Sequence, residues 1–162
     1  MPETYIHYGS EHFDISKFEP IKNIGGVGGR EVKPSGGLWA SFYDDSEDKY
    51  DWENFCIEND FNLDKTKKSF RFNLKKNSKV LLIDDIQKLK KLQSDGYTRD
   101  MDERFAHLFH DLYCLDFEKL VDDGYDAIKV FIRSNDIYYA LYGWDIDSLL
   151  VLNPDCILEI NC

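Results

Sequence analysis

Alternating and continuous runs of apolar residues predict β-strands near both ends of the chain. In Ser69–Leu74 the large apolar residues occupy every second position, which is typical of a strand with one buried face. Lys79–Ile83 is a nearly continuous apolar run, which favours a strand buried on both faces. Further strands are expected at Thr4–Tyr8, Leu38–Tyr43, Asp126–Ile132, Ile137–Tyr142, Ser148–Leu152 and Cys156–Ile160.

The middle of the chain has helical spacing instead. Ile86, Leu89 and Leu92 recur three residues apart, so they share one face of a helix expected over about 84–94. Ser46 is expected to cap a second helix over about 47–60, because acidic residues follow in its first turn. The inward residues of that helix are expected to include Tyr50, Ile57 and Phe61. Two more helices are predicted over about 101–113 and Phe117–Val121.

These elements predict one α+β domain spanning residues 1–162, with a mixed or antiparallel sheet and flanking helices. Ser134-Asn135-Asp136 is turn chemistry, so Asp126–Ile132 and Ile137–Tyr142 are expected to form a hairpin. A corner at Gly143-Trp144 then leads into the buried strand Ser148–Leu152, which Asn153-Pro154 ends.

Asp145 and Asp147 precede that buried strand, where many enzymes place an acid. A carboxylate at the mouth of a strand is held by backbone on one side and faces a cleft on the other. The alternative interpretation is that both aspartates only cap a turn.

Charge narrows the classes of partner. The chain has 162 residues, a formal net charge of −11 and a pI near 4.7, so its surface as a whole repels nucleic-acid backbones. Segment 64–91 is the exception, with ten Lys/Arg and three Asp that give +7 and leave −18 for the rest. Lys65–Lys91 is therefore a candidate contact for an anionic partner, or else a solvated surface whose lysines prevent edge pairing.

Cysteine, histidine and glycine patterns add little specific chemistry. Cysteines stand at 56, 114, 156 and 162 without metal-ligand spacing, which favours free thiols in a reducing cytoplasm. His107 and His110 lie three apart on a predicted helix but lack further ligands at a usual spacing, so no metal site is predicted. The glycines at 25–29 do not match a phosphate-binding loop, and a mobile flap beside a pocket is the better interpretation. The chain begins without a secretory signal and has no apolar run of membrane length, which also predicts a cytoplasmic protein.

Three short stretches follow one another in a suggestive order. They are His7-Tyr8-Gly9-Ser10, then Gly36-Gly37-Leu38-Trp39-Ala40-Ser41 before a helix with Trp52 and Cys56, then Ser148–Ile157 around Asn153. A fourth short stretch, Asp123–Ile128, lies between the second and the third. Together they resemble the signatures of the ADP-ribosyltransferase fold of the His-Tyr-Glu type, as in diphtheria-toxin-like and poly-ADP-ribose-polymerase-like enzymes.

The resemblance implies a split sheet that holds NAD in a cleft, with nicotinamide between aromatic side chains. His7 would hydrogen-bond the adenosine ribose, the Gly9 backbone would hold the nicotinamide amide, and Ser10 would support that wall. Trp39 takes the place of the family's stacking tyrosine, with Tyr8 or Tyr43 as the opposite wall. Ser41 completes the second signature and belongs to the expected NAD site.

The third signature departs from the family, because Ser148 takes the place of its catalytic glutamate. Asp147 is the expected acid, with Ser148 orienting the ribose and Asp145 as the second candidate. Neighbouring strand residues face opposite ways, so Asp147 reaches the cleft only if a bulge or the Gly143 corner re-aims it.

The resemblance therefore implies a mono-ADP-ribosyltransferase that uses NAD as a substrate. Its acceptor is a macromolecule, with protein favoured over nucleic acid. The missing glutamate leaves a second hypothesis open: a catalytically inactive acidic protein on the same fold that binds a basic protein surface. A third hypothesis is an enzyme that reaches nucleic acid through Lys65–Lys91.

Overall fold

A seven-stranded mixed sheet organises the chain. The computed structural model describes residues 2–25, 32–100, 112–132 and 135–160. The strands run in the order β4-β5-β6-β2-β1-β3-β7, and the β4–β5 pair is parallel while the other pairs are antiparallel. Their bounds are β1 Thr4–Tyr8, β2 Leu38–Phe42, β3 Ser69–Leu74, β4 Val80–Ile83, β5 Ala127–Val130, β6 Ser148–Val151 and β7 Ile157–Glu159.

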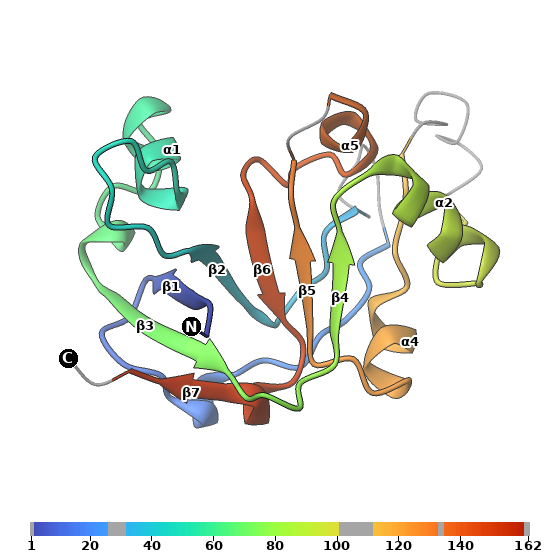
Figure 1. Ribbon diagram of the computed structural model, residues 1–162, viewed down its shortest axis with the longest axis horizontal. Coiled ribbons are helices and arrows are strands. Elements are labelled where there is room, and N and C mark those ends of the chain that lie inside the picture. Colours follow the sequence, from blue (N-terminus) through green and yellow to red (C-terminus); the bar gives the residue numbers. More distant parts are fainter. Residues whose placement is uncertain (1, 26–31, 101–111, 133–134, 161–162) are drawn as a thin grey trace.

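The sheet has two halves that share β2. Figure 1 shows β4, β5 and β6 on one side of β2, and β1, β3 and β7 on the other. The described part of the chain has four α-helices, α1 Trp52–Glu58, α2 Ile86–Ser94, α4 Phe117–Asp122 and α5 Asn135–Ala140. Helices α2, α4 and α5 lie beside the β4–β6 half, and α1 lies beside the other half (Figure 1). None of the helices in these residues is long and apolar enough to cross a bilayer.

Strand β6 is buried on both faces, which explains its continuous apolar sequence. Leu150 belongs to a core that includes the buried residues of α2, α4 and α5. Leu149 and Val151 point the opposite way, into a second core with Tyr5, Phe72 and their neighbours. The strand therefore joins two apolar cores, and its position is fixed from both sides.

The predicted α+β class is confirmed, and each of the seven strands lies at a predicted segment. The predicted strand Ile137–Tyr142 is wrong, because these residues belong to helix α5 and the turn after it. Ile137, Ala140 and Leu141 are buried, at helical spacing, while the tyrosines between and after them are exposed. The aromatic composition indicated a strand, but the burial period is that of a helix, so the predicted hairpin does not form.

The helix expected over 47–60 is shorter than predicted. Asp51, not Ser46, caps α1 with a capping box, and Cys56 is its buried residue. Tyr50, Ile57 and Phe61, expected to face inward, are exposed. The predicted helix over 101–113 lies largely outside the described residues, as do most of the glycine-rich stretch and the His107–His110 pair; residues 112–113 are not helical.

Two consecutive glycines let the chain enter β2 through a crowded point. Gly36 and Gly37 have φ of 75° and 72°. A Cβ on Gly36 would lie 2.2 Å from the Pro20 carbonyl oxygen, and one on Gly37 would lie 2.9 Å from the Val151 carbonyl oxygen. The approach of β2 to β6 therefore requires glycine at position 37, and the approach to the backbone of Glu19 and Pro20 requires it at position 36.

We expect Gly36→Ala to destabilise the fold far more than Gly124→Ala. Both glycines have positive φ, but a Cβ on Gly124 would meet no atom within 4 Å. Gly124→Ala should lose only the conformational term, about 1 kcal/mol, whereas Gly36→Ala adds a backbone clash and should lose about 3 kcal/mol or more. Urea denaturation of the two variants measures the difference. Equal losses would contradict the crowding at Gly36.

Candidate functional site

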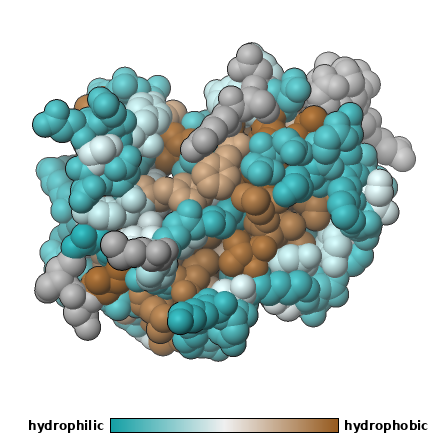
Figure 2. All heavy atoms as spheres, viewed as in Figure 1, coloured by the Kyte–Doolittle hydropathy of each residue, from teal (hydrophilic) through white to brown (hydrophobic). Residues whose placement is uncertain are grey.

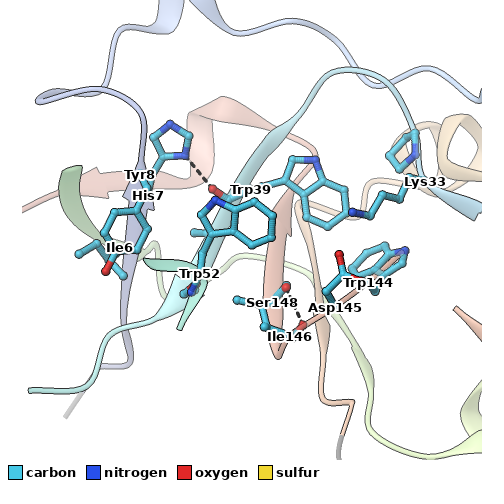
Figure 3. Close-up of a pocket in the computed structure, with 13 residues that line it drawn as sticks. Ile6, His7, Tyr8, Lys33, Trp39, Trp52, Trp144, Asp145, Ile146 and Ser148 are labelled. Carbon is cyan, nitrogen blue, oxygen red and sulfur yellow. Dashed lines mark hydrogen bonds between the residues drawn. The ribbon is translucent and has the colours of Figure 1, made fainter. Parts of the chain in front are cut away.

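A cavity of about 260 Å³, here called the inner cavity, lies where β1 and β2 meet α1 and the segment leading into β6. In the space-filling view, apolar atoms line a notch between the hydrophilic surface over α1 and the rest of the molecule (Figure 2). Figure 3 shows the lining side chains. They are Ile6, His7, Tyr8, Lys33, Pro34, Trp39, Ala40, Ser41, Trp52, Trp144, Asp145, Ile146 and Ser148.

Three tryptophans from distant parts of the chain form the aromatic wall. Trp39 and Trp144 meet edge to face, with ring centroids 4.6 Å apart. Trp52, the first residue of α1, stacks on Phe55 at 5.2 Å and an interplanar angle of 16°. Trp144 is also a core residue, 1% exposed, so this wall is anchored in the fold. Such a wall suits a planar ring.

Tyr8 and Ser41 hold α1 at the cavity. The Tyr8 hydroxyl donates to the Asp51 carboxylate at 2.6 Å, and the same carboxylate accepts from the amides of Glu53 and Asn54. The Ser41 hydroxyl accepts from the Trp52 amide at 3.0 Å. Burial and the bond to Asp51 raise the pKa of Tyr8 above its usual range, so it stays a donor at neutral pH. Tyr8 and Ser41, both expected at the NAD site, thus also position Trp52.

His7 borders the inner cavity, but its ring is already engaged. Its Nδ1 lies 2.7 Å from the Trp39 carbonyl oxygen, to which it donates, and its ring lies 5.2 Å from that of Phe70. Phe70 belongs to the apolar core on the other side of the strand. Burial lowers the pKa of His7, and the bond to Trp39 opposes this only in part. His7 therefore fixes the backbone that carries Trp39.

Lys33 and Asp145 supply the charge at the cavity. The Lys33 amine lies 5.2 Å from the centre of the Trp39 ring. Burial lowers the pKa of Lys33, and the negative charge of Asp145 opposes that shift. Asp145 is the one carboxylate among the lining residues and is half-buried. One cation and one anion thus share a mostly aromatic space.

The two candidate acids, Asp145 and Asp147, differ in whether they line the inner cavity. Ser148 lines the inner cavity, and its hydroxyl donates to the Ile146 carbonyl at 2.8 Å. Asp147 is not among the lining residues, and its carboxylate accepts from the Ile132 amide at 2.7 Å. Its neighbours Ile146 and Ser148 line the cavity, while the Asp147 carboxylate is held at Ile132. Of the two aspartates, Asp145, which precedes Ile146 at the corner, lines the cavity.

Three other residues expected at the NAD site lie outside the inner cavity. The Gly9 amide donates to the Lys68 carbonyl at 2.8 Å, so it is not free to hold a ligand. The exposed Ser10 hydroxyl donates to the His12 carbonyl. Tyr43 lines a separate hollow, where the Arg71 guanidinium lies 4.8 Å from its ring centre.

No sequence motif singles out Lys33 or Trp144 as a site residue. Lys33 lies in an irregular segment without a motif, and Trp144 was interpreted as part of a corner. Only the packing of the two against Trp39 identifies them. No group of three or more His, Cys, Asp or Glu residues within the described ranges is arranged to hold a metal ion. Cys56 and Cys156 are buried free thiols, and Cys114 is buried as well.

The sequence matches no protein-family model, and no curated protein or solved structure matches it.

We expect Asp51→Ala to disturb the inner cavity, unlike the removal of an equivalent helix cap elsewhere. Asp85 caps α2 through the Lys88 amide and is not a cavity residue. Asp85→Ala should lose about 1 kcal/mol, whereas Asp51→Ala also leaves the Tyr8 hydroxyl without its acceptor and should lose about 2–3 kcal/mol. Denaturation curves measure both, and only Asp51→Ala should shift the tryptophan emission maximum. An emission maximum of Asp51→Ala equal to that of the wild type would show that the position of α1 does not depend on this carboxylate.

The buried His7 should make stability fall in mildly acidic solution. Its pKa is lowered in the folded protein and is near 6.5 in the unfolded chain, so below about pH 6.5 the unfolded chain binds a proton that the folded protein does not. The free energy of unfolding then decreases as the pH falls from about 6.5 towards the folded pKa. His7→Gln lacks this term, so its melting temperature should fall less than that of the wild type between about pH 7.5 and 5.5. Identical slopes in thermal melting would contradict the buried, neutral imidazole.

Proposed function

We propose that this chain is a mono-ADP-ribosyltransferase with an ADP-ribosyltransferase-like fold, which transfers ADP-ribose from NAD to a macromolecular acceptor. One observation carries the proposal. Residues of all three stretches that resemble the family line the same cavity, although they are far apart in the sequence: Tyr8, Trp39 and Ser148. Strand β2, which joins the two halves of the sheet, contributes Trp39, Ala40 and Ser41 to this cavity.

The inner cavity suits the nicotinamide ring of NAD. Its aromatic walls offer edges and faces to a planar ring, each contact contributing about 0.5–1.5 kcal/mol. The nicotinamide of NAD carries a positive charge, which the carboxylate of Asp145 at the cavity attracts. Asp145 thus replaces Asp147 as the acid in our proposal.

The reaction breaks the bond between the nicotinamide nitrogen and C1′ of the ribose. The bonding electron pair leaves with nicotinamide, and the ribose develops oxocarbenium character, as in glycoside hydrolysis. The fixed negative charge of Asp145 stabilises that positive charge. An acceptor nucleophile then bonds to C1′ and gives up its proton, while water in its place yields slow hydrolysis of NAD.

A protein acceptor is favoured over a nucleic acid. The net charge of −11 repels a polyanion. Several lysines of the basic segment lie beside carboxylates, as in the pairs Lys67–Asp64 and Lys88–Asp84. We place the reaction in the cytoplasm, where NAD is available and buried thiols such as Cys56 stay reduced.

A second candidate function is an inactive NAD-binding or protein-binding module on the same fold. Ser148 stands where the related enzymes have their glutamate, which favours this alternative. Tight binding to a basic protein that neither NAD nor Asp145→Asn affects would support it over the enzyme.

We expect Asp145→Asn to abolish release of nicotinamide from labelled NAD, and Asp147→Asn to preserve it. In Asp147→Asn the side-chain oxygen can still accept the hydrogen bond from the Ile132 amide, so Asp147→Asn is a matched control next to the site. Loss of a fixed charge at a developing oxocarbenium ion should lower the rate about 100-fold or more. Both variants should melt within a few degrees of the wild type, and NAD should still quench tryptophan fluorescence in both.

The pattern of failure separates the hypotheses. An active Asp145→Asn variant with an inactive Asp147→Asn variant would reverse the assignment of the acid. Fluorescence quenching by NAD without nicotinamide release in the wild type, even with cell lysate as a source of acceptor, would favour the inactive module.

A further inference from the structure

A second hollow adjoins the inner cavity. This outer groove has a volume of about 530 Å³ and is lined by Phe55, Asn59, Phe61 and Asn62 of α1 and the turn after it. Three residues line both spaces, namely Lys33, Trp52 and Asp145. The two spaces therefore meet at an amine, an indole and a carboxylate.

The outer groove has its own aromatic surface. Phe55 stacks on Trp52, and Phe61 meets Trp52 edge to face at 6.1 Å and 89°. Phe61 is 48% exposed, although it is a large apolar side chain. An uncovered ring beside a stacked aromatic pair offers a platform for a second planar group.

Two amide side chains border that platform. Asn59 donates from Nδ2 to the Phe55 carbonyl at 2.8 Å, which leaves its oxygen as an acceptor. The side chain of Asn62 makes no hydrogen bond within the described residues. Amides beside aromatic rings recognise nucleobases, because they pair with the donors and acceptors at the edge of a base while the rings stack on its face.

Lys33 gives the junction its preference for an anion. The Lys33 side chain is half-buried, and the desolvation of its amine lowers the pKa and disfavours the charge. Its contacts are the Trp39 ring and the longer-range charge of Asp145, and no carboxylate of the described residues forms an ion pair with it. A phosphate at this position would compensate the desolvated charge.

We propose that the outer groove binds the adenosine half of NAD, with the pyrophosphate beside Lys33. This rests on the proposed function, since it assumes nicotinamide in the inner cavity. Two aromatic compartments separated by a cation match two planar bases separated by two phosphates. A peptide acceptor in the groove would have no need of a buried cation at the junction.

Adenosine bound in the outer groove would not contact His7. The resemblance implied a hydrogen bond from His7 to the adenosine ribose, but the Nδ1 of His7 is engaged by Trp39 and its ring packs on Phe70. In our proposal His7 acts as a positioning residue for Trp39, and α1 supplies the adenosine contacts.

Calorimetric titration with NAD, nicotinamide mononucleotide and AMP tests the proposal. Phe61→Ala and Asn62→Ala should each weaken NAD about tenfold and weaken AMP, but leave nicotinamide mononucleotide unchanged. Lys33→Gln should weaken all three, since each carries phosphate, without lowering the melting temperature. Ile57→Ala is the matched control, because Ile57 is 61% exposed on α1 and does not line the groove. It should bind all three ligands as the wild type does.

The three ligands separate the two proposals. If NAD and nicotinamide mononucleotide bind but Phe61→Ala and Asn62→Ala leave NAD affinity unchanged, the adenosine site is overturned and the proposed function stands. If AMP binding depends on Phe61 while nicotinamide mononucleotide does not bind, the groove is supported as a nucleotide site and the proposed function fails. Absence of binding by all three ligands overturns both.

Discussion

The pairing of β2 with two partners is the constraint on which the site depends. Ser41 lies opposite Ile6 of β1, and Trp39 lies opposite Leu150 of β6. One short strand therefore brings β1 and β6, which lie far apart in the sequence, to the same cavity. The crowded glycines at its start leave little freedom in this arrangement, because both would clash with neighbouring backbone if they carried a Cβ. The distance between Tyr8 and Asp145 in the sequence is thus removed by hydrogen bonds of the sheet, not by flexible loops.

Most of the polar side chains around the inner cavity form hydrogen bonds that hold α1 and Trp39 in place. Hydrogen bonds join β1 and β2 to the first turn of α1. Tyr8 of β1 donates to Asp51, which accepts from the Glu53 amide, and Ser41 of β2 accepts from the Trp52 amide. His7 is tied to the Trp39 carbonyl. The consequence is a cavity whose remaining charges, on Lys33 and Asp145, face a largely aromatic surface. In such a setting each charge acts at a longer range than in water, which is the condition for electrostatic stabilisation of a reacting sugar.

Much of the sheet could be predicted from the sequence, because alternation and apolar runs follow directly from burial. Ser69–Leu74 and Ser148–Val151 are examples in which the pattern and the structure agree. Helix α5 was missed, because its tyrosines have high strand propensity while its burial follows Ile137, Ala140 and Leu141. Tertiary packing decided that element. For the site, the short motifs led to Trp39 and Ser148, but Lys33 enters through a loop whose path no local pattern specifies.

The position of the acid illustrates how a corner can change chemistry. A residue within a strand is committed to one face by the two-residue period, and at β6 that period gives the cavity to Ser148 and turns Asp147 towards Ile132. Gly143, with φ of 86°, ends the turn that follows α5, and between it and β6 the direction of a side chain is not set by the sheet. Asp145 uses that freedom and reaches the junction of the inner cavity and the outer groove. In the proposed binding mode, a carboxylate that lines both spaces lies beside the nicotinamide ribose, between the ring in the inner cavity and the pyrophosphate at Lys33. A corner aspartate can therefore do the work of a strand glutamate, provided that the loop carrying it is held as firmly as Trp144 holds this one.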